Sequence, residues 1–160
     1  MKRILITGGC GFIGSYFTDL QVKTDMEVIV VDKLTYASNI DYLPEGTKLI
    51  KKDINDLTYD DIGEIQYCVN FAAESHVDNS IDDGSPFVKT NINGTFHLLE
   101  LCRKMKSFKK FVQISTDEVY GDVKEPSVEI DVLKPSSYYS ATKAAADQIV
   151  LAAGKTYELP

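Results

Sequence analysis

The sequence predicts an α/β fold in which helices cover both faces of a parallel sheet. Five short apolar runs alternate along the chain with longer stretches whose apolar residues recur at helical spacing. The first run ends at a glycine cluster in which Gly8, Gly11 and Gly14 are three residues apart, and a helical stretch follows. Strands that alternate with helices pair in parallel, because each helix carries the chain back to the start of the next strand. We therefore expect a doubly wound parallel sheet.

The expected strands are rich in Ile, Val, Leu and Phe, as is typical of parallel strands buried on both faces. We place strands at 3–7, 27–31, 47–51, 66–71 and 110–115, and helices at 12–23, 56–62, 86–105 and 137–155. In the third helix Pro86 is near the start, where its missing N–H costs nothing. Ile92, Phe96 and Leu99 are expected along its buried side, together with Cys102.

Composition narrows the class of protein. A chain of 160 residues forms one domain with a core of its own. The net charge of −7 argues against nucleic-acid binding, and no apolar run approaches the ~18 residues of a membrane span. The cysteines (Cys10, Cys68 and Cys102) are odd in number and form no CxxC pair. We expect reduced thiols in a cytoplasmic protein, with no zinc or other metal site.

The glycine cluster has the features of a dinucleotide-binding turn. A tight turn needs a residue that tolerates positive φ, and a pyrophosphate needs backbone N–H groups without a Cβ in the way. The second apolar run ends in Asp32, 18 residues after Gly14. A carboxylate there accepts hydrogen bonds from ribose hydroxyls and repels a 2′-phosphate, which favours NAD over NADP. The alternatives are an ordinary strand–helix turn and an Asp32 that only caps a turn.

Polar residues follow several of the strands, whose carboxyl ends meet at one edge of a parallel sheet. Tyr139 and Lys143 are four residues apart, so they share one face of the last helix. A lysine beside a phenol lowers its pKa, and such a tyrosine can take a proton from an alcohol while hydride leaves the same carbon. Asp117 and Glu118 could divide the roles of acid and base. The alternatives are a surface Tyr–Lys pair and two solvent-facing carboxylates.

The motifs together resemble the extended short-chain dehydrogenase/reductases, and among them the dTDP-glucose 4,6-dehydratases. The matching segments are 7–14, 32–37, 71–78, 89–91, 115–121 and 139–147, which are collinear and extend over nearly the whole chain. The first and last are shared by the wider superfamily, whereas Thr116-Asp117-Glu118 is more particular to the dehydratases. The sequence departs from the family at Cys10 (usually alanine), Tyr138 (commonly proline) and Asn79 (frequently arginine).

The resemblance implies a Rossmann-type NAD-binding domain and a role for each catalytic residue. Tyr139 takes the proton of the sugar 4-hydroxyl while hydride passes from C4 to NAD, Glu118 takes the C5 proton, and Asp117 protonates the departing 6-hydroxyl. Hydride then returns to C6, which gives a 4-keto-6-deoxy sugar. Thr116 binds the 4-oxygen, and Lys143 orients the nicotinamide ribose and tunes Tyr139.

The resemblance also implies a set of binding residues. The cofactor set is Gly8, Gly11, Phe12, Ile13 and Gly14 at the pyrophosphate, Asp32, Lys33, Leu34 and Thr35 at the ribose, Asp53 and Ile54 at the adenine, and Phe71, Ala72, Ala73, Glu74, Ser75 and Thr90 along the cofactor path, with Tyr139 and Lys143. The residues expected to contact the nucleotide-sugar substrate are Ser75, His76 and Thr116.

Chains of this family are about twice as long, so we expect residues 1–160 to be the cofactor half, without the C-terminal substrate domain. We expect this chain by itself not to turn over substrate, and the strand at 110–115 to be an edge of the sheet, open to pairing. The resemblance implies a homodimer through the helices at 86–105 and 137–155. Two other functions remain open: a related 4-epimerase or decarboxylase, and a non-catalytic NAD-binding module.

Overall fold

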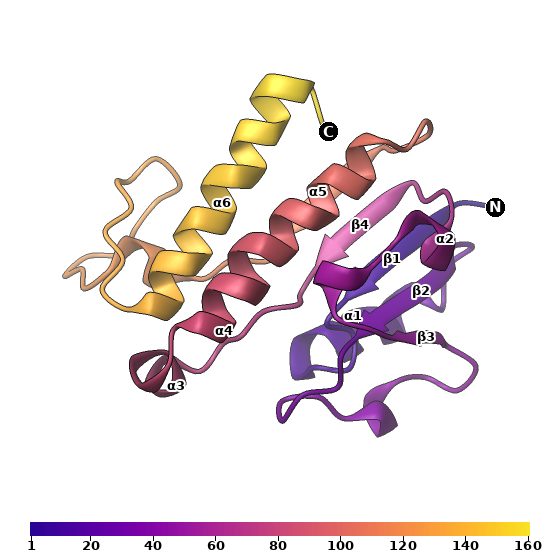
Figure 1. Cartoon of the computed structure of the whole chain (residues 1–160), viewed down its shortest axis with the longest axis horizontal. Coiled ribbons are helices and arrows are strands. Elements are labelled where there is room, and N and C mark those ends of the chain that lie inside the picture. Colours follow the sequence, from indigo (N-terminus) through magenta and orange to yellow (C-terminus); the bar gives the residue numbers. More distant parts are fainter.

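The computed structural model describes residues 1–160 as a parallel sheet of five strands between two layers of helices (Figure 1). The strands are β1 (Arg3–Thr7), β2 (Glu27–Asp32), β3 (Lys48–Lys51), β4 (Tyr67–Asn70) and β5 (Lys110–Gln113). Their order in the sheet is β3-β2-β1-β4-β5, and every neighbouring pair is parallel. The prediction of a doubly wound parallel sheet is confirmed.

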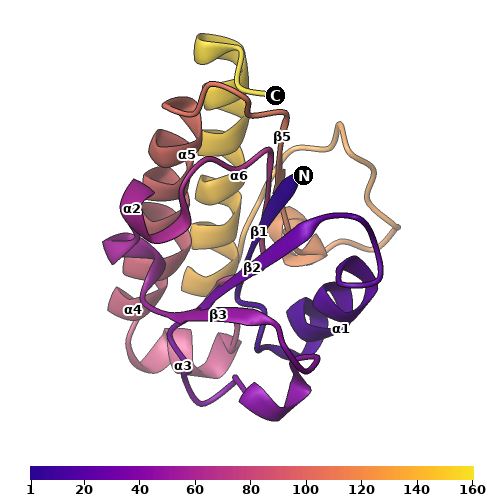
Figure 2. The ribbon, with the colours of Figure 1, turned by 90° about the vertical axis from the view of Figure 1, so that its right-hand side faces the viewer.

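The helices divide between the two faces of the sheet (Figure 2). They are α1 (Phe12–Gln21), α2 (Tyr59–Ile62), α3 (Val77–Asp82), α4 (Ser85–Phe87), α5 (Thr95–Arg103) and α6 (Tyr138–Tyr157). Helix α1 covers one face, and α5 and α6 lie side by side on the other. None of the helices combines the length and the apolar character that a membrane span requires.

Two helical predictions need correction. The sequence patterns missed the short helix α3, which has only six residues and too few apolar positions to show a period. The helix expected at 86–105 is helical almost throughout, but a π-helical segment at Val88–Gly94 separates α4 from α5. A π turn contains an extra residue and rotates everything after it about the helix axis. Phe96, expected to be buried, is 55% exposed, because the buried side of α5 is formed by Thr95, Leu98, Leu99 and Cys102 and Phe96 lies off that side. Leu99 and Cys102 are buried as expected.

The core has two parts because side chains alternate across each strand. Leu5, Ile29 and Val31 point to the α5–α6 face and pack with Leu98. Ile4, Ile6, Val28, Val30 and Val69 point to the α1 face and form a second buried cluster, against which Phe17 packs. Burial on both faces explains why the strands are uninterrupted apolar runs.

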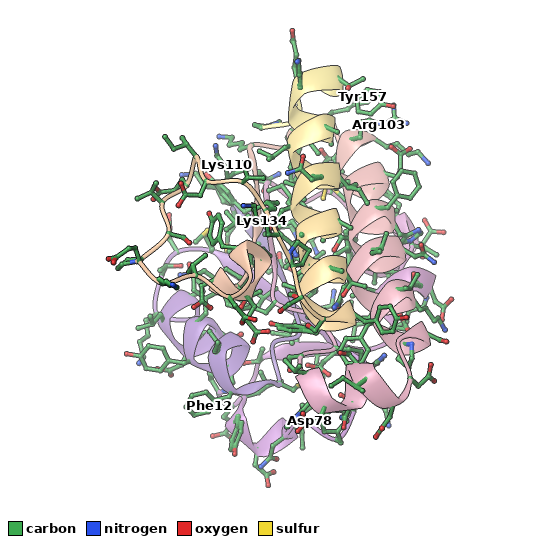
Figure 3. The ribbon with its side chains drawn as sticks, turned by 90° about the vertical axis from the view of Figure 1, so that its left-hand side faces the viewer. Phe12, Asp78, Arg103, Lys110, Lys134 and Tyr157 are labelled. Atoms are coloured by element: carbon green, nitrogen blue, oxygen red, sulfur yellow. The ribbon has the colours of Figure 1, made fainter.

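The packing of α5 against α6 extends to their far ends. The guanidinium of Arg103, at the end of α5, lies over the ring of Tyr157, at the end of α6, with 4.8 Å between the Cζ atom and the ring centroid (Figure 3). A cation over an aromatic face contributes about 0.5–1 kcal/mol at an exposed site.

The strand β5 forms an edge of the sheet, as predicted. Its outer side is not fully open, because the N–H of Phe111 donates a hydrogen bond of 2.7 Å to the carbonyl of Pro160. One outer donor of this edge strand is therefore satisfied within the chain. Pairing of the rest of β5 with another polypeptide stays a prediction.

Asp61, in helix α2, provides a test of acid sensitivity. Its carboxylate accepts hydrogen bonds from Lys52 Nζ at 2.7 Å and from the backbone N–H and hydroxyl of Thr58, and these lower its pKa from 3.8 to about 2. The charged form stabilises the folded state at all pH values above 3.8, and this contribution is lost as the pH falls toward 2. We expect Asp61→Asn to lose less of its free energy of unfolding than the wild type across that window, as measured by urea denaturation.

The control for this experiment is Asp60→Asn, which removes an exposed carboxylate from the same helix. Its free energy of unfolding should fall with pH in the same way as that of the wild type. Identical profiles for all three proteins would show that the Lys52–Asp61 contact does not affect acid stability.

Candidate active site

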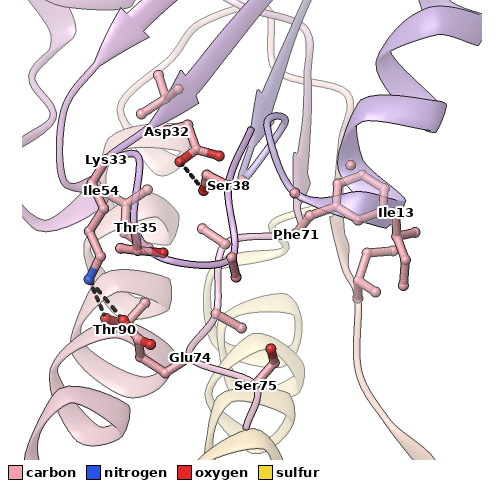
Figure 4. Close-up of a pocket in the computed structure, with 18 of the residues that line it drawn as sticks. Ile13, Asp32, Lys33, Thr35, Ser38, Ile54, Phe71, Glu74, Ser75 and Thr90 are labelled. Carbon is pink, nitrogen blue, oxygen red and sulfur yellow. Dashed lines mark hydrogen bonds and ion pairs between the residues drawn. The ribbon is translucent and has the colours of Figure 1, made fainter. Parts of the chain in front are cut away.

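A cavity of about 330 Å³ opens at the carboxyl edge of the sheet (Figure 4). Its walls come from the segments that follow all five strands and from α6. Almost the whole predicted cofactor set lines it: Gly8, Gly11, Phe12, Ile13, Gly14, Asp32, Lys33, Thr35, Asp53, Ile54, Phe71, Ala72, Ala73, Glu74, Ser75, Thr90, Tyr139 and Lys143. The topology of the sheet thus brings these residues to one site.

The glycine loop is held by close approaches between backbone atoms. Gly8 follows β1 directly with φ +67°, and a Cβ added there would be 2.6 Å from the backbone N of Ala72. Gly14 is in the first turn of α1, and a Cβ added there would be 2.2 Å from the carbonyl oxygen of Gly8. Side chains at these two positions would fill the cradle, so both must be glycine for the loop to keep this shape.

Asp32 joins the glycine loop to the loop after β2. One of its carboxylate oxygens accepts the backbone N–H of Cys10 at 3.0 Å. The other accepts the backbone N–H of Leu34 and the hydroxyl of Ser38, both at 2.8 Å. The Ser38 contact is drawn in Figure 4. Asp32 therefore does cap a turn, and it also lines the cavity, where its remaining acceptor capacity is available to a ligand.

Leu34 is the one member of the predicted cofactor set that does not line the cavity. Its side chain packs against the buried cluster on the α1 face, and its backbone takes a φ of +58°. The left-handed conformation turns the apolar side chain away from the cavity and into the core. Ala37 and Ser38 line the wall nearby.

Cys10 is enclosed by the same core cluster and is not exposed. Burial, and then the negative charge of Asp32, raise the pKa of its thiol to about 11. Because the thiolate is the reactive form, Cys10 is an inert core residue in the position where the family usually has alanine.

Lys33 connects three loops across one end of the cavity (Figure 4). Its Nζ lies 3.1 Å from a carboxylate oxygen of Glu74, 3.9 Å from one of Asp53 and 3.3 Å from the hydroxyl of Thr90. Burial raises the pKa of Asp53, but hydrogen bonds from Asn55 and the nearby lysines outweigh it and lower that pKa overall. The ammonium group of Lys33 therefore lies between the carboxylates of Glu74 and Asp53 at the wall of the cavity.

Tyr139 and Lys143 lie on one face of α6, as predicted, and both side chains line the cavity. The helix begins with a capping box between Ser137 and Ser140, which fixes its first turn and so the position of Tyr139. Lys143 donates a hydrogen bond from Nζ to the carbonyl oxygen of Ile114, just after β5. Burial lowers the pKa of Lys143, and the charge of Asp147 opposes that shift.

The expectation that Lys143 lowers the pKa of Tyr139 is wrong for this structure. Burial raises the pKa of the phenol, an interaction with the Thr116 side chain opposes this, and the carboxylates of Glu118 and Asp117 raise it further. The ammonium group of Lys143 is engaged with the Ile114 carbonyl instead. The turn at Asp117–Tyr120 packs against α6, which brings its carboxylates close enough to the phenol to act on it.

The turn at Asp117–Tyr120 forms a rim outside the cavity. The hydroxyl of Thr116 accepts the N–H of Glu118 at 3.3 Å, and Asp117 and Glu118 are exposed. Of the residues expected to contact substrate, Ser75 lines the cavity and Thr116 lies next to Tyr139. His76 is outside it, at the start of α3, with its ring centroid 6.4 Å from that of Tyr36.

Sequence reasoning missed some of the cavity wall. The additional lining residues are Val31, Ala37, Ser38, Lys52, Ile114 and Ser115. All of them stand at or soon after the carboxyl end of a strand. The edge rule that placed the other residues could therefore have found them.

A protein-family model described as GDP-mannose 4,6-dehydratase matches residues 5–160. The chain belongs to this family. The match covers the sheet, the glycine loop and the Tyr139–Lys143 helix, and it confirms the resemblance on which the site residues were assigned.

Curated relatives in the family include nucleotide-sugar dehydratases. A probable dTDP-glucose 4,6-dehydratase of Sinorhizobium fredii is 43% identical over 99% of this chain and 51% of its own length. The dTDP-glucose 4,6-dehydratase of Mycobacterium tuberculosis is 43% identical over 97% of this chain and 50% of its own length. The chain thus spans about half the length of the curated relatives it matches.

Solved structures share the fold. The dTDP-glucose 4,6-dehydratase of Streptomyces venezuelae, solved with NAD bound, superposes with a TM-score of 0.92 at 39% identity, over 98% of this chain and 53% of the other. The UDP-glucose 4-epimerase of Thermus thermophilus, also solved with NAD, superposes with a TM-score of 0.89 at 30% identity, over 98% and 53%. Two enzymes named for different reactions therefore share the fold of this chain over about half of their own length.

Proposed function

We propose that this chain is the NAD-binding half of a nucleotide-sugar 4,6-dehydratase that acts on dTDP-glucose. One observation carries the proposal. A single cavity is lined by a glycine cradle, Asp32, Tyr139 and Lys143, and the turn that carries the carboxylates of Asp117 and Glu118 packs against the helix of Tyr139. A phenol, an ammonium group and two carboxylates next to a dinucleotide cradle match the chemistry of alcohol oxidation followed by loss of water.

The cavity residues fit NAD. The cradle admits no Cβ at Gly8 or Gly14, so backbone N–H groups and the start of α1 can approach a pyrophosphate. Asp32 offers acceptors to ribose hydroxyls, and its negative charge disfavours a 2′-phosphate. When bound, NAD supplies the hydride acceptor and donor of the reaction.

The remaining steps are proton transfers by residues of this chain. Tyr139 takes the proton of the 4-hydroxyl, with Thr116 beside it to bind the 4-oxygen. Lys143, one turn along α6, orients the ribose. Glu118 removes the C5 proton, which a 4-ketone makes acidic, and Asp117 protonates the departing 6-hydroxyl so that it leaves as water. Glu118 then returns a proton to C5, which the saturated 4-keto-6-deoxy product requires.

Two alternatives have specific support. A 4-epimerase or a decarboxylase would also need NAD, Tyr139 and Lys143, and epimerases are among the structural relatives. Neither reaction needs an acid and a base like Asp117 and Glu118, which favours the dehydratase. A non-catalytic NAD-binding module would explain the cradle but not the ammonium group and the two carboxylates near Tyr139.

Assembly and compartment belong to the same proposal. We place the dimer contact on α5 and α6, which present the exposed apolar side chains Phe96 and Leu151. Three free, buried cysteines are in keeping with a reducing compartment such as the cytoplasm.

Calorimetric titration of the purified chain with NAD and with NADP tests the cofactor assignment. We expect NAD to bind, and NADP to bind at least about tenfold more weakly because of Asp32. Asp32→Ala should reduce this preference. Equal or stronger binding of NADP would overturn the assignment.

The reaction is tested with a chain that also carries a second half like that of the relatives. With dTDP-glucose, Asp117→Asn should block the loss of water while oxidation at C4 remains visible as reduction of bound NAD. In an epimerase, the same substitution would leave product formation unchanged. Residues 1–160 alone should form no 4-keto-6-deoxy sugar, and its formation would contradict the assignment of this chain as the cofactor half only.

A further inference from the structure

The ammonium group of Lys143 is buried at the wall of the cavity, with little access to water. The residue is only 4% exposed, and its Nζ makes a hydrogen bond to a neutral partner, the carbonyl oxygen of Ile114. Burying an ammonium group is costly unless a negative charge compensates it. The structure must therefore supply a carboxylate near Lys143 if the side chain is to stay protonated.

Asp147 is one helical turn further along α6, on the same face as Lys143. It is half-buried, and its carboxylate accepts a hydrogen bond of 2.5 Å from the hydroxyl of Ser115. Ser115 is next in the chain to Ile114, and both line the cavity. Asp147 thus holds the same two-residue segment that receives the hydrogen bond from Lys143.

The other charged groups around the cavity interact with partners other than Lys143. On α6, Tyr139 is the only other titratable neighbour on this face, and on the rim Asp117 and Glu118 act on its phenol. Across the cavity, Glu74 is paired with Lys33. Asp147 is the one charge that counteracts the effect of burial on the pKa of Lys143, and Lys143 in turn lowers the pKa of Asp147, which burial raises.

We propose that Asp147 is a positioning residue: through Ser115 it fixes the segment after β5, and through its charge it keeps Lys143 protonated beside Tyr139. The inference rests on the proposed function, since a protonated Lys143 matters where the ribose of the cofactor must be held. Its physical content can be tested in the free chain, without cofactor or substrate.

Competitive acetylation provides that test. Trace acetic anhydride reacts only with neutral amines, so the labelling rate of each lysine, read by peptide mass spectrometry over a range of pH, reports its protonation. In Asp147→Asn, we expect Lys143 to be labelled about tenfold faster than in the wild type at pH values below its pKa, because loss of the Asp147 charge lowers the pKa of Lys143 further. The other lysines of the variant serve as internal standards.

Three further variants separate charge from structure. Asp147→Glu keeps the charge and should restore labelling to near the wild-type rate. Glu100→Gln removes a carboxylate that pairs with Arg103 on the surface of α5, and should leave Lys143 unchanged. Ser115→Ala keeps Asp147 but breaks its hydrogen bond, and should raise labelling of Lys143 about threefold. This variant also keeps the test available if Asp147→Asn does not fold.

The outcomes distinguish this inference from the proposed function. Unchanged labelling of Lys143 in folded Asp147→Asn, or in Ser115→Ala if that is the variant that folds, overturns the role of Asp147 even if the chain binds NAD. Faster labelling in a chain that fails to bind NAD supports the role of Asp147 and rejects the assigned cofactor. Faster labelling together with a loss of NAD affinity in Asp147→Asn that becomes larger as the pH rises supports both.

Discussion

Replacing Gly14 with alanine is expected to weaken NAD binding by about a hundredfold, which corresponds to ~2.7 kcal/mol. The added Cβ would be 2.2 Å from the carbonyl oxygen of Gly8 and 3.1 Å from the Cα of Gly9. Both are backbone atoms, so no side-chain rotation relieves the clash, and the loop must move out of its cradle. Helix propensity acts in the opposite direction, because alanine is favoured over glycine inside a helix by about 1 kcal/mol. A loss of affinity would therefore report on the cradle.

The measurement is calorimetric titration with NAD, with circular dichroism to verify folding. Gly46→Ala is the matched control, because Gly46 has a φ of +79° but open space around it, away from the cavity. This substitution should lower stability slightly and leave NAD affinity unchanged. Gly11→Ala should lie in between, since its Cβ would be 3.3 Å from the Gly8 oxygen. If folded Gly14→Ala bound NAD as the wild type does, the cradle would not be the pyrophosphate site.

Replacing Asn91 with alanine is expected to reduce the free energy of unfolding by about 3 kcal/mol. Asn91 is 2% exposed and lies in the π-helical segment. Its side chain accepts the N–H of Glu74 at 2.8 Å, and donates to the carbonyl of Glu74 at 3.1 Å and to the hydroxyl of Thr142 at 3.0 Å. Without it, two backbone groups stay buried and unpaired, which is the costly case. Such a loss is large for a domain whose total stability is of the order of 5–15 kcal/mol.

Urea denaturation followed by circular dichroism measures this loss. Asn39→Ala is the control: Asn39 is exposed and accepts one hydrogen bond, from the N–H of Asp41 at 3.0 Å, so its loss should cost at most about 1 kcal/mol. Equal stability losses in the two variants would mean that the contacts of Asn91 are worth no more than a surface cap. Because Thr142 stands between Tyr139 and Lys143 on α6, Asn91→Ala should also weaken NAD binding.

Local patterns were sufficient for much of the fold and the site. Uninterrupted apolar runs such as 28–31 have the length and residue types of strands buried on both faces, whichever strands lie beside them. The glycine spacing, the aspartate after the second strand and the four-residue spacing of Tyr139 and Lys143 each depend on a few neighbouring residues. The parallel topology then determines that all of these stand at one edge.

The errors have a common origin in distant packing. Phe96 is exposed because the core lies against the other side of α5, and the side chain of Leu34 packs against the buried cluster on the α1 face instead of lining the cavity. The pKa of Tyr139 rises because its phenol is buried and lies near the carboxylates of Glu118 and Asp117. The ammonium group of Lys143 donates its hydrogen bond to the Ile114 carbonyl and not to the phenol. Each of these depends on which atoms surround a side chain, and residues far apart in the chain supply them.

The amino-acid order alone therefore determined the class of fold, the strand positions, the dinucleotide cradle and the residues suited to acid–base chemistry. These features follow from backbone sterics, side-chain periodicity and short-range spacing. Only the tertiary structure decided which side chains share the cavity, which stand at its rim, and how Asp147 and Ser115 support Lys143. Burial and electrostatic interaction are set by distances in space, and these exist only once the sheet and its two layers of helices have assembled.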